Sequence, residues 1–122
     1  MRRYEGSASG LAAAGALLAG VAVALAAYAN HGMEGDARAA LQSAAVFAFG
    51  HGIALAALSR GLRDPMAKLA LLALLAGTLL FAGAVVSRHL LGGPSAFAPW
   101  GGGLTMFGWL LYAISALRTP RR

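Results

Sequence analysis

Four long runs of apolar residues, separated by short polar segments, dominate the pattern of this chain. They cover about residues 9–30, 39–59, 66–89 and 100–117. A helix of about 20 apolar residues matches the roughly 30 Å hydrocarbon core of a bilayer. Because backbone groups in lipid must hydrogen-bond within their own segment, each run is predicted to be a helix.

The runs lack the polar stripe that each helix of a soluble four-helix bundle would need. Residues 11–29 carry no charge, and the hydrophobic fraction of the whole chain is 59%, above the roughly 45–50% of soluble domains. The first run is also longer than the apolar region of a typical signal peptide, so we expect a retained span. The predicted fold is all-α: an integral membrane bundle of four antiparallel transmembrane helices, forming one domain over residues 1–122.

Basic residues collect in alternate gaps between the runs. Arg38 and Arg88 occupy two of the gaps, and the other eight of the ten Lys and Arg residues lie in the alternate ones: Arg2, Arg3, Arg60, Arg63, Lys68, Arg118, Arg121 and Arg122. Cytoplasmic segments of membrane proteins are enriched in Lys and Arg. We therefore expect a multi-pass membrane protein, with both termini and the 60–65 loop in the cytoplasm.

The same charge distribution argues against nucleic acid as a partner. The net charge of +6 comes from residues at span ends, where they face lipid phosphates and set orientation. The chain also has no Cys, which excludes disulfides and thiolate chemistry. No nucleophile elbow, phosphate-binding Gly-rich loop or pair of facing carboxylates is visible. We expect the lipid bilayer as a partner, no cofactor and no enzymatic activity.

Ala and Gly recur at four-residue spacing, for example in Ala40/Ala44/Ala48 and in Ala73/Gly77. Small residues let helix backbones approach closely in lipid, where no hydrophobic force drives helices together. These residues are compatible with packing inside one bundle, or with a face for a homo-oligomer or a larger membrane complex. The leading functional hypothesis is a non-enzymatic membrane protein that self-associates or serves as an accessory subunit.

His51 is the main candidate for chemistry. It lies about twelve residues into the second run, roughly 18 Å below the boundary, where an ionisable residue is a functional hypothesis by default. The same depth on antiparallel neighbours falls near Thr78 and between Trp109 and Tyr112. One interpretation is structural, with a neutral His51 that donates a hydrogen bond to the hydroxyl of Thr78 or Tyr112. The alternative is a binding site for lipid or quinone, or a proton or solute conduit, bordered by the same residues.

Two further histidines lie at the outer boundary, from which the depth of His51 is counted. His31 and His89 end the first and third runs, and Glu34 and Asp36 follow His31 in the sequence. Two imidazoles and a carboxylate are ligands that a divalent metal accepts. No two of the histidines have the i, i+4 spacing of one helix face, so the alternative is that they are solvated residues near helix ends.

Several short stretches resemble a known family. They occur in order over nearly the whole chain: Ala29-Asn30-His31-Gly32, His51-Gly52-Ile53-Ala54-Leu55, Gly77-Thr78-Leu79-Leu80-Phe81-Ala82-Gly83, Pro99-Trp100-Gly101-Gly102 and Gly108-Trp109-Leu110. In this series the chain resembles the YgdD-like small four-span membrane proteins of bacteria, a family of unknown function with a mitochondrial relative. It departs from the family at Gly50, where an aromatic residue usually precedes the histidine, and at Ala82 and Ala84, where Ser is common. The resemblance implies a four-helix integral membrane protein of the bacterial inner membrane and supplies no substrate, cofactor or reaction.

Overall fold

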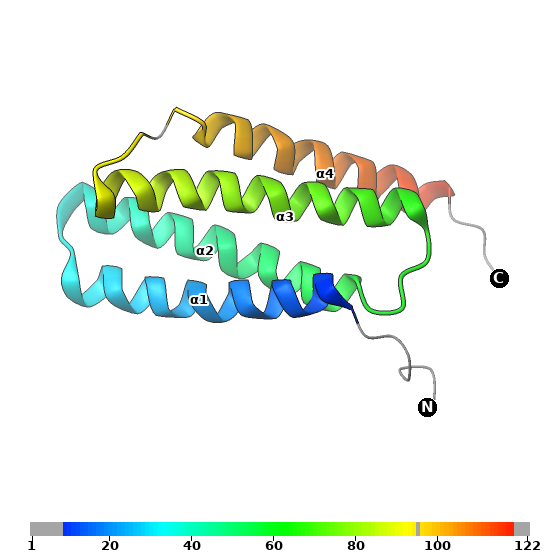
Figure 1. The fold of residues 1–122 in the computed structure, drawn as a ribbon, viewed down its shortest axis with the longest axis horizontal. Helices are drawn as coiled ribbons and strands as arrows, with labels where there is room; N and C mark the ends of the chain where they lie inside the picture. Colours follow the sequence, from blue (N-terminus) through cyan, green and yellow to red (C-terminus); the bar gives the residue numbers. More distant parts are fainter. Residues whose placement is uncertain (1–8, 95, 119–122) are drawn as a thin grey trace.

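The computed structural model describes residues 9–94 and 96–118, and Figure 1 shows the course of the chain. Arg2, Arg3, Arg121 and Arg122 lie outside the described residues. The helices are α1 (Gly10–Gly32), α2 (Gly35–Leu58), α3 (Pro65–Val86) and α4 (Ala98–Arg118), and a π-helical turn, η2 (Ser87–Leu91), extends α3. No strand occurs in the described residues. By length and composition all four long helices could cross a membrane, as the apolar runs predict.

The helices run up and down in an open arrangement. In Figure 1 the α1–α2 and α3–α4 connections lie at one end, and the α2–α3 connection lies at the other with the start of α1 and the end of α4. We call these the histidine end, which holds His31 and His89, and the basic end, which holds Arg60, Arg63 and Arg118. Helix α1 packs along α2, α2 against α3, and α3 along α4. Among the described residues, no Cα atom of α4 lies within 8 Å of one in α1 or α2.

Local sequence signals mark both ends of the third helical segment. Asp64 caps the helix, since its Oδ1 accepts from the Met66 N–H at 3.2 Å, and Pro65 follows in the first turn. Pro is favoured there because the missing N–H would have no partner in the helix. At the far end, Gly92 has a φ of 71° and stops η2. Such a left-handed conformation is easily accessible only to Gly.

The connection between α1 and α2 is shorter than the sequence pattern indicated. We expected a loop over residues 31–38, but α2 begins at Gly35 and only Met33 and Glu34 join the helices. Asp36 therefore lies in the first turn of α2, where its negative charge interacts favourably with the helix dipole. The Arg38 Nε also donates to the Met33 carbonyl at 2.9 Å, which closes the turn.

Small residues form the closest helix contacts. Ala44, Ala48, Ala73 and Gly77 of the predicted small-residue spacing are all buried within one copy of the chain. The backbones of α1 and α2 come closest at glycines: a Cβ added to Gly52 would lie 2.6 Å from the carbonyl oxygen of Gly15. Gly77 and Gly101 make the corresponding close approach between α3 and α4. Packing inside one bundle therefore uses much of the Ala and Gly content.

Candidate functional site

His51 lies on α2, seven residues before the helix ends at Leu58, or about 10 Å from the basic end. It is half-buried, while Gly52 next to it is buried and Gly50 is exposed. Gly52 holds α2 against α1, which fixes the rotation of α2 and directs the neighbouring imidazole toward α4. The site is thus positioned by a helix contact on the other side of α2.

Both ring nitrogens of His51 have a protein partner. Nδ1 lies 2.8 Å from the Phe47 carbonyl oxygen, one turn earlier on α2. The indole Nε1 of Trp109 donates to Nε2 at 2.9 Å. A carbonyl can only accept and an indole N–H can only donate. These partners therefore specify a neutral His51 with its proton on Nδ1.

The His51–Trp109 hydrogen bond belongs to a chain of rings, which we call the aromatic bridge: Phe47, His51, Phe81, Trp109 and Tyr112. Ring centroids are 4.4 Å apart for Phe47–His51, 4.6 Å for Phe47–Phe81 and 6.3 Å for the edge-on pair Trp109–Tyr112. These are distances at which aromatic pairs attract. The bridge joins α2, α3 and α4, and it links α2 to α4, whose backbones do not meet.

The structure corrects the hydrogen bond predicted for His51. We expected the imidazole to donate to the hydroxyl of Thr78 or Tyr112, but it pairs with the Phe47 carbonyl and the Trp109 indole instead. Tyr112 contributes its ring edge to Trp109. Thr78 is fully buried, and within the described part of the chain its Oγ1 has no hydrogen-bond partner.

Sequence reasoning missed two members of the bridge, Phe47 and Phe81. A signal for Phe47 was present, because residues four apart share one face of a helix, and Phe47 lies four residues before His51. Phe81 carried no comparable signal, since it lies on another helix whose rotation the sequence does not reveal.

The proposed outer metal site gains no support from the geometry. His31 is exposed at the end of α1, and His89 lies in η2. Across residues 9–94 and 96–118, no group of three His, Cys, Asp or Glu side chains could hold a metal ion. Two histidines and a carboxylate, the set that the sequence suggested, are therefore not brought together.

Comparison with known proteins adds a family but no chemistry. A family model described as a protein of unknown function, DUF423, matches residues 25–102. The match runs from the last turns of α1 to the start of α4, so it includes His51, Phe47 and Phe81 and stops before Trp109. No curated protein and no solved structure matches the chain.

Proposed function

We propose that this chain, which belongs to the DUF423 family of unknown function, is a non-enzymatic integral membrane subunit that self-associates through α1. The observation that carries the proposal is a second face of small residues on that helix, turned away from the bundle.

Helix α1 has two small-residue faces. One is buried or half-buried inside the bundle and includes Gly15, which contacts Gly52 of α2: Ala12, Gly15, Ala19, Ala22, Ala26 and Ala29. The other, which we call the outward face, is exposed throughout: Ala13, Ala16, Gly20, Ala24 and Ala27. At about 100° per residue the centres of the two sets lie about 120° apart around the helix. A Cβ added to Gly20 would meet nothing within 4 Å, so another helix backbone has room to approach.

The open arrangement leaves this face uncovered. Helix α1 packs mainly along α2 and touches α3 on its inner side, and in the described part of the chain no Cα atom of α4 lies within 8 Å of it. Lipid tails pack no better against Ala and Gly than against other apolar residues. Two helices with small residues four apart, in contrast, can approach closely and pack against each other. Ala16, Gly20 and Ala24 have that spacing. A second copy of α1 fits such a face.

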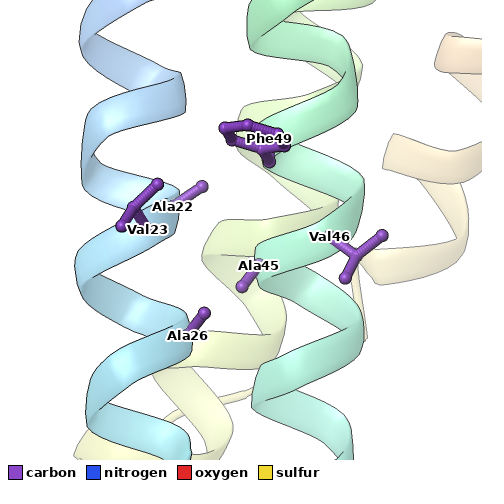
Figure 2. Close-up of a pocket in the computed structure, with 6 residues that line it drawn as sticks. All are labelled: Ala22, Val23, Ala26, Ala45, Val46 and Phe49. Atoms are coloured by element: carbon purple, nitrogen blue, oxygen red, sulfur yellow. The ribbon is translucent and has the colours of Figure 1, made fainter.

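A groove between α1 and α2 adjoins the outward face. Figure 2 shows Ala22, Val23 and Ala26 of α1 opposite Ala45, Val46 and Phe49 of α2. The groove has a volume of about 240 Å³, and only apolar side chains line it. An apolar side chain of a partner helix could fill it, which would extend the contact beyond α1.

The alternative role for His51, in ligand binding or conduction, receives less support from the geometry. Both nitrogens of the ring already have partners on the same protein. A ligand or a proton would first have to displace the Phe47 carbonyl or the Trp109 indole. A structural role, in which His51 sets the position of α4 against α2, uses every polar atom of the side chain.

The self-association test uses the absence of Cys from the chain. In membranes treated with a mild oxidant, Gly20→Cys and Ala24→Cys are each expected to give a covalent dimer. Gly83→Cys is the control, because Gly83 is an exposed glycine on α3 that also has nothing within 4 Å of its added Cβ. Cross-linking of Gly83→Cys alone, or none from any position, overturns the proposal.

A second measurement separates a homo-oligomer from an accessory subunit. The purified protein in mild detergent should be a dimer or larger, and Gly20→Leu should convert it to the monomer while Gly83→Leu does not. A monomer that co-purifies stoichiometrically with a different protein would establish the accessory role instead. A lone monomer with no partner contradicts both versions.

We also infer the orientation in the membrane. Arg60, Arg63, Lys68 and Arg118 gather at the basic end, whereas Arg38 and Arg88 lie toward the other, and cytoplasmic ends carry the excess of Lys and Arg. This supports a bacterial inner-membrane protein with the basic end in the cytoplasm. Reporter fusions after Arg122 should be active only with a cytoplasmic reporter. Activity only with a periplasmic reporter would reverse the orientation.

A further inference from the structure

A pocket at the basic end combines charged and apolar groups. It lies between the α2–α3 connection and the last turns of α4 and has a volume of about 410 Å³. Leu62, Arg63 and Asp64 line it from the connection, and Tyr112 and Ser115 line it from α4. We call it the basic-end pocket.

The carboxylate in this pocket already has partners. The Ser115 hydroxyl donates to Asp64 Oδ2, and the Met66 N–H donates to Oδ1. The hydroxyl hydrogen bond, with the Met66 N–H and the positive charge of Arg118, outweighs partial desolvation and lowers the pKa of Asp64. Asp64 is therefore ionised at neutral pH, and its role in capping α3 and holding α4 is complete without a ligand.

The hydrogen-bond donors of the Arg63 and Arg118 guanidinium groups are used less fully than the acceptors of Asp64. Arg63 is exposed at the pocket. The Nη1 of Arg118 donates to the Met66 sulfur at 3.4 Å, and a thioether is a weak acceptor. Each guanidinium offers five N–H donors. With Asp64 the two arginines leave one net positive charge, together with donors suited to an anion that accepts several hydrogen bonds.

The depth of the pocket indicates the source of that anion. The ends of membrane-spanning helices lie among lipid headgroups, where Lys and Arg face phosphates. Arg matches phosphate oxygens with paired N–H groups, and basic pockets between transmembrane helices are known to bind anionic headgroups. Leu62 and Tyr112 add apolar surface beside the charges, which suits the first part of an acyl chain.

We propose that the basic-end pocket binds a phospholipid with one net negative charge, of the phosphatidylglycerol type, through Arg63 and Arg118. An ammonium headgroup is disfavoured because it would add a positive charge to a site where Arg63, Arg118 and Asp64 already leave one net positive charge. The proposal is independent of self-association through α1, since the outward face and this pocket share no residue.

Native mass spectrometry of the purified protein tests the site. The protein is mixed with equal amounts of phosphatidylglycerol, phosphatidylethanolamine and phosphatidylcholine, and bound lipid is counted. One phosphatidylglycerol per chain should be retained in preference to the other two. Arg63→Gln and Arg118→Gln should each lower its retention about fivefold, since one Arg near an anionic surface contributes about 1 kcal/mol.

Two controls keep the outcome clear. Arg88→Gln makes the same change at the histidine end and should leave retention unchanged, and Arg63→Lys should keep most of it because the charge remains. Equal retention of all three lipids, unchanged retention in Arg63→Gln, or the same loss in Arg88→Gln each overturns the proposal. Variants are compared only if their unfolding midpoints without lipid equal that of the parent protein. If Arg63→Gln is less stable than the parent, the retention of phosphatidylglycerol by Arg118→Gln decides by the same criteria.

Discussion

Gly50 and Gly52 flank His51 and look equivalent in the sequence, yet the structure predicts opposite effects when each is replaced by Ala. A Cβ on Gly52 would lie 2.6 Å from the Gly15 carbonyl oxygen and 2.8 Å from the Ala19 nitrogen, both backbone atoms of α1. A Cβ on Gly50 would meet nothing within 4 Å. The pair is therefore a matched test of where α1 and α2 touch.

The size of the effect follows from these distances. A carbon and a carbonyl oxygen in contact are at least about 3.3 Å apart, so Gly52→Ala must move α1 and α2 about 0.7 Å apart near the contact. Gaps of about 0.5–1 Å forfeit a quarter to a half of the dispersion energy between the atoms involved. We expect Gly52→Ala to lower the free energy of unfolding by about 1–3 kcal/mol, as overpacking typically does. Gly50→Ala should be neutral or stabilising by up to about 1 kcal/mol, because Ala favours helix over Gly.

Unfolding in mixed micelles, followed by circular dichroism as the denaturing detergent increases, measures both variants. Gly15→Ala should resemble Gly52→Ala, because its added Cβ would lie 2.6 Å from the Gly52 carbonyl oxygen. The double variant should cost less than the sum of the two, since one separation of the helices relieves both contacts. If Gly52→Ala proved as stable as Gly50→Ala, the glycine contact between α1 and α2 would be refuted.

Three further predictions concern the aromatic bridge and the helix ends. Trp109→Phe removes the donor to His51, and a double-mutant cycle with His51→Phe should give a coupling of about 0.6–1.7 kcal/mol, the range for hydrogen bonds between membrane helices; zero coupling would contradict the bond. The pKa of Asp64 is lowered, chiefly by the Ser115 hydroxyl, so its stabilisation is complete above the ordinary value of 3.8 and is lost as pH falls through the lower, folded pKa. Unfolding midpoints measured between pH 7 and 2 should drop at the acid end, and Ser115→Ala should shrink that drop; an unchanged profile would count against the link. Gly92→Ala places a side chain at a φ of 71° and should lower the unfolding free energy by about 1–2 kcal/mol, and no loss would mean that η2 does not end in a left-handed turn.

The parts of the candidate site that could be predicted from the sequence were predicted from their depth in the membrane. Depth in the membrane follows from counting residues along a helix, and this counting correctly placed Trp109 near the level of His51. The identity of the hydrogen-bond partner does not follow from depth. It depends on how far each helix is rotated about its axis, and helices that are apolar all round show no face that marks this rotation. The sequence therefore could not reveal that Trp109, rather than Thr78 or Tyr112, forms the hydrogen bond with His51.

The four helices could be predicted from the sequence, because length and apolar content are properties of neighbouring residues. The charged segments between them could be read in the same way. The end of the third helical segment was predicted near residue 89, whereas η2 continues to Leu91. Contacts between helices became visible only in the fold: Gly52 faces α1 while Gly50 faces outward, and Trp109 completes the hydrogen bonds of His51. The fold also showed that α1 and α4 stay apart, which leaves the outward face of α1 uncovered. These features depend on which helices pair and at what rotation, and close contact between small residues far apart in the chain settles both.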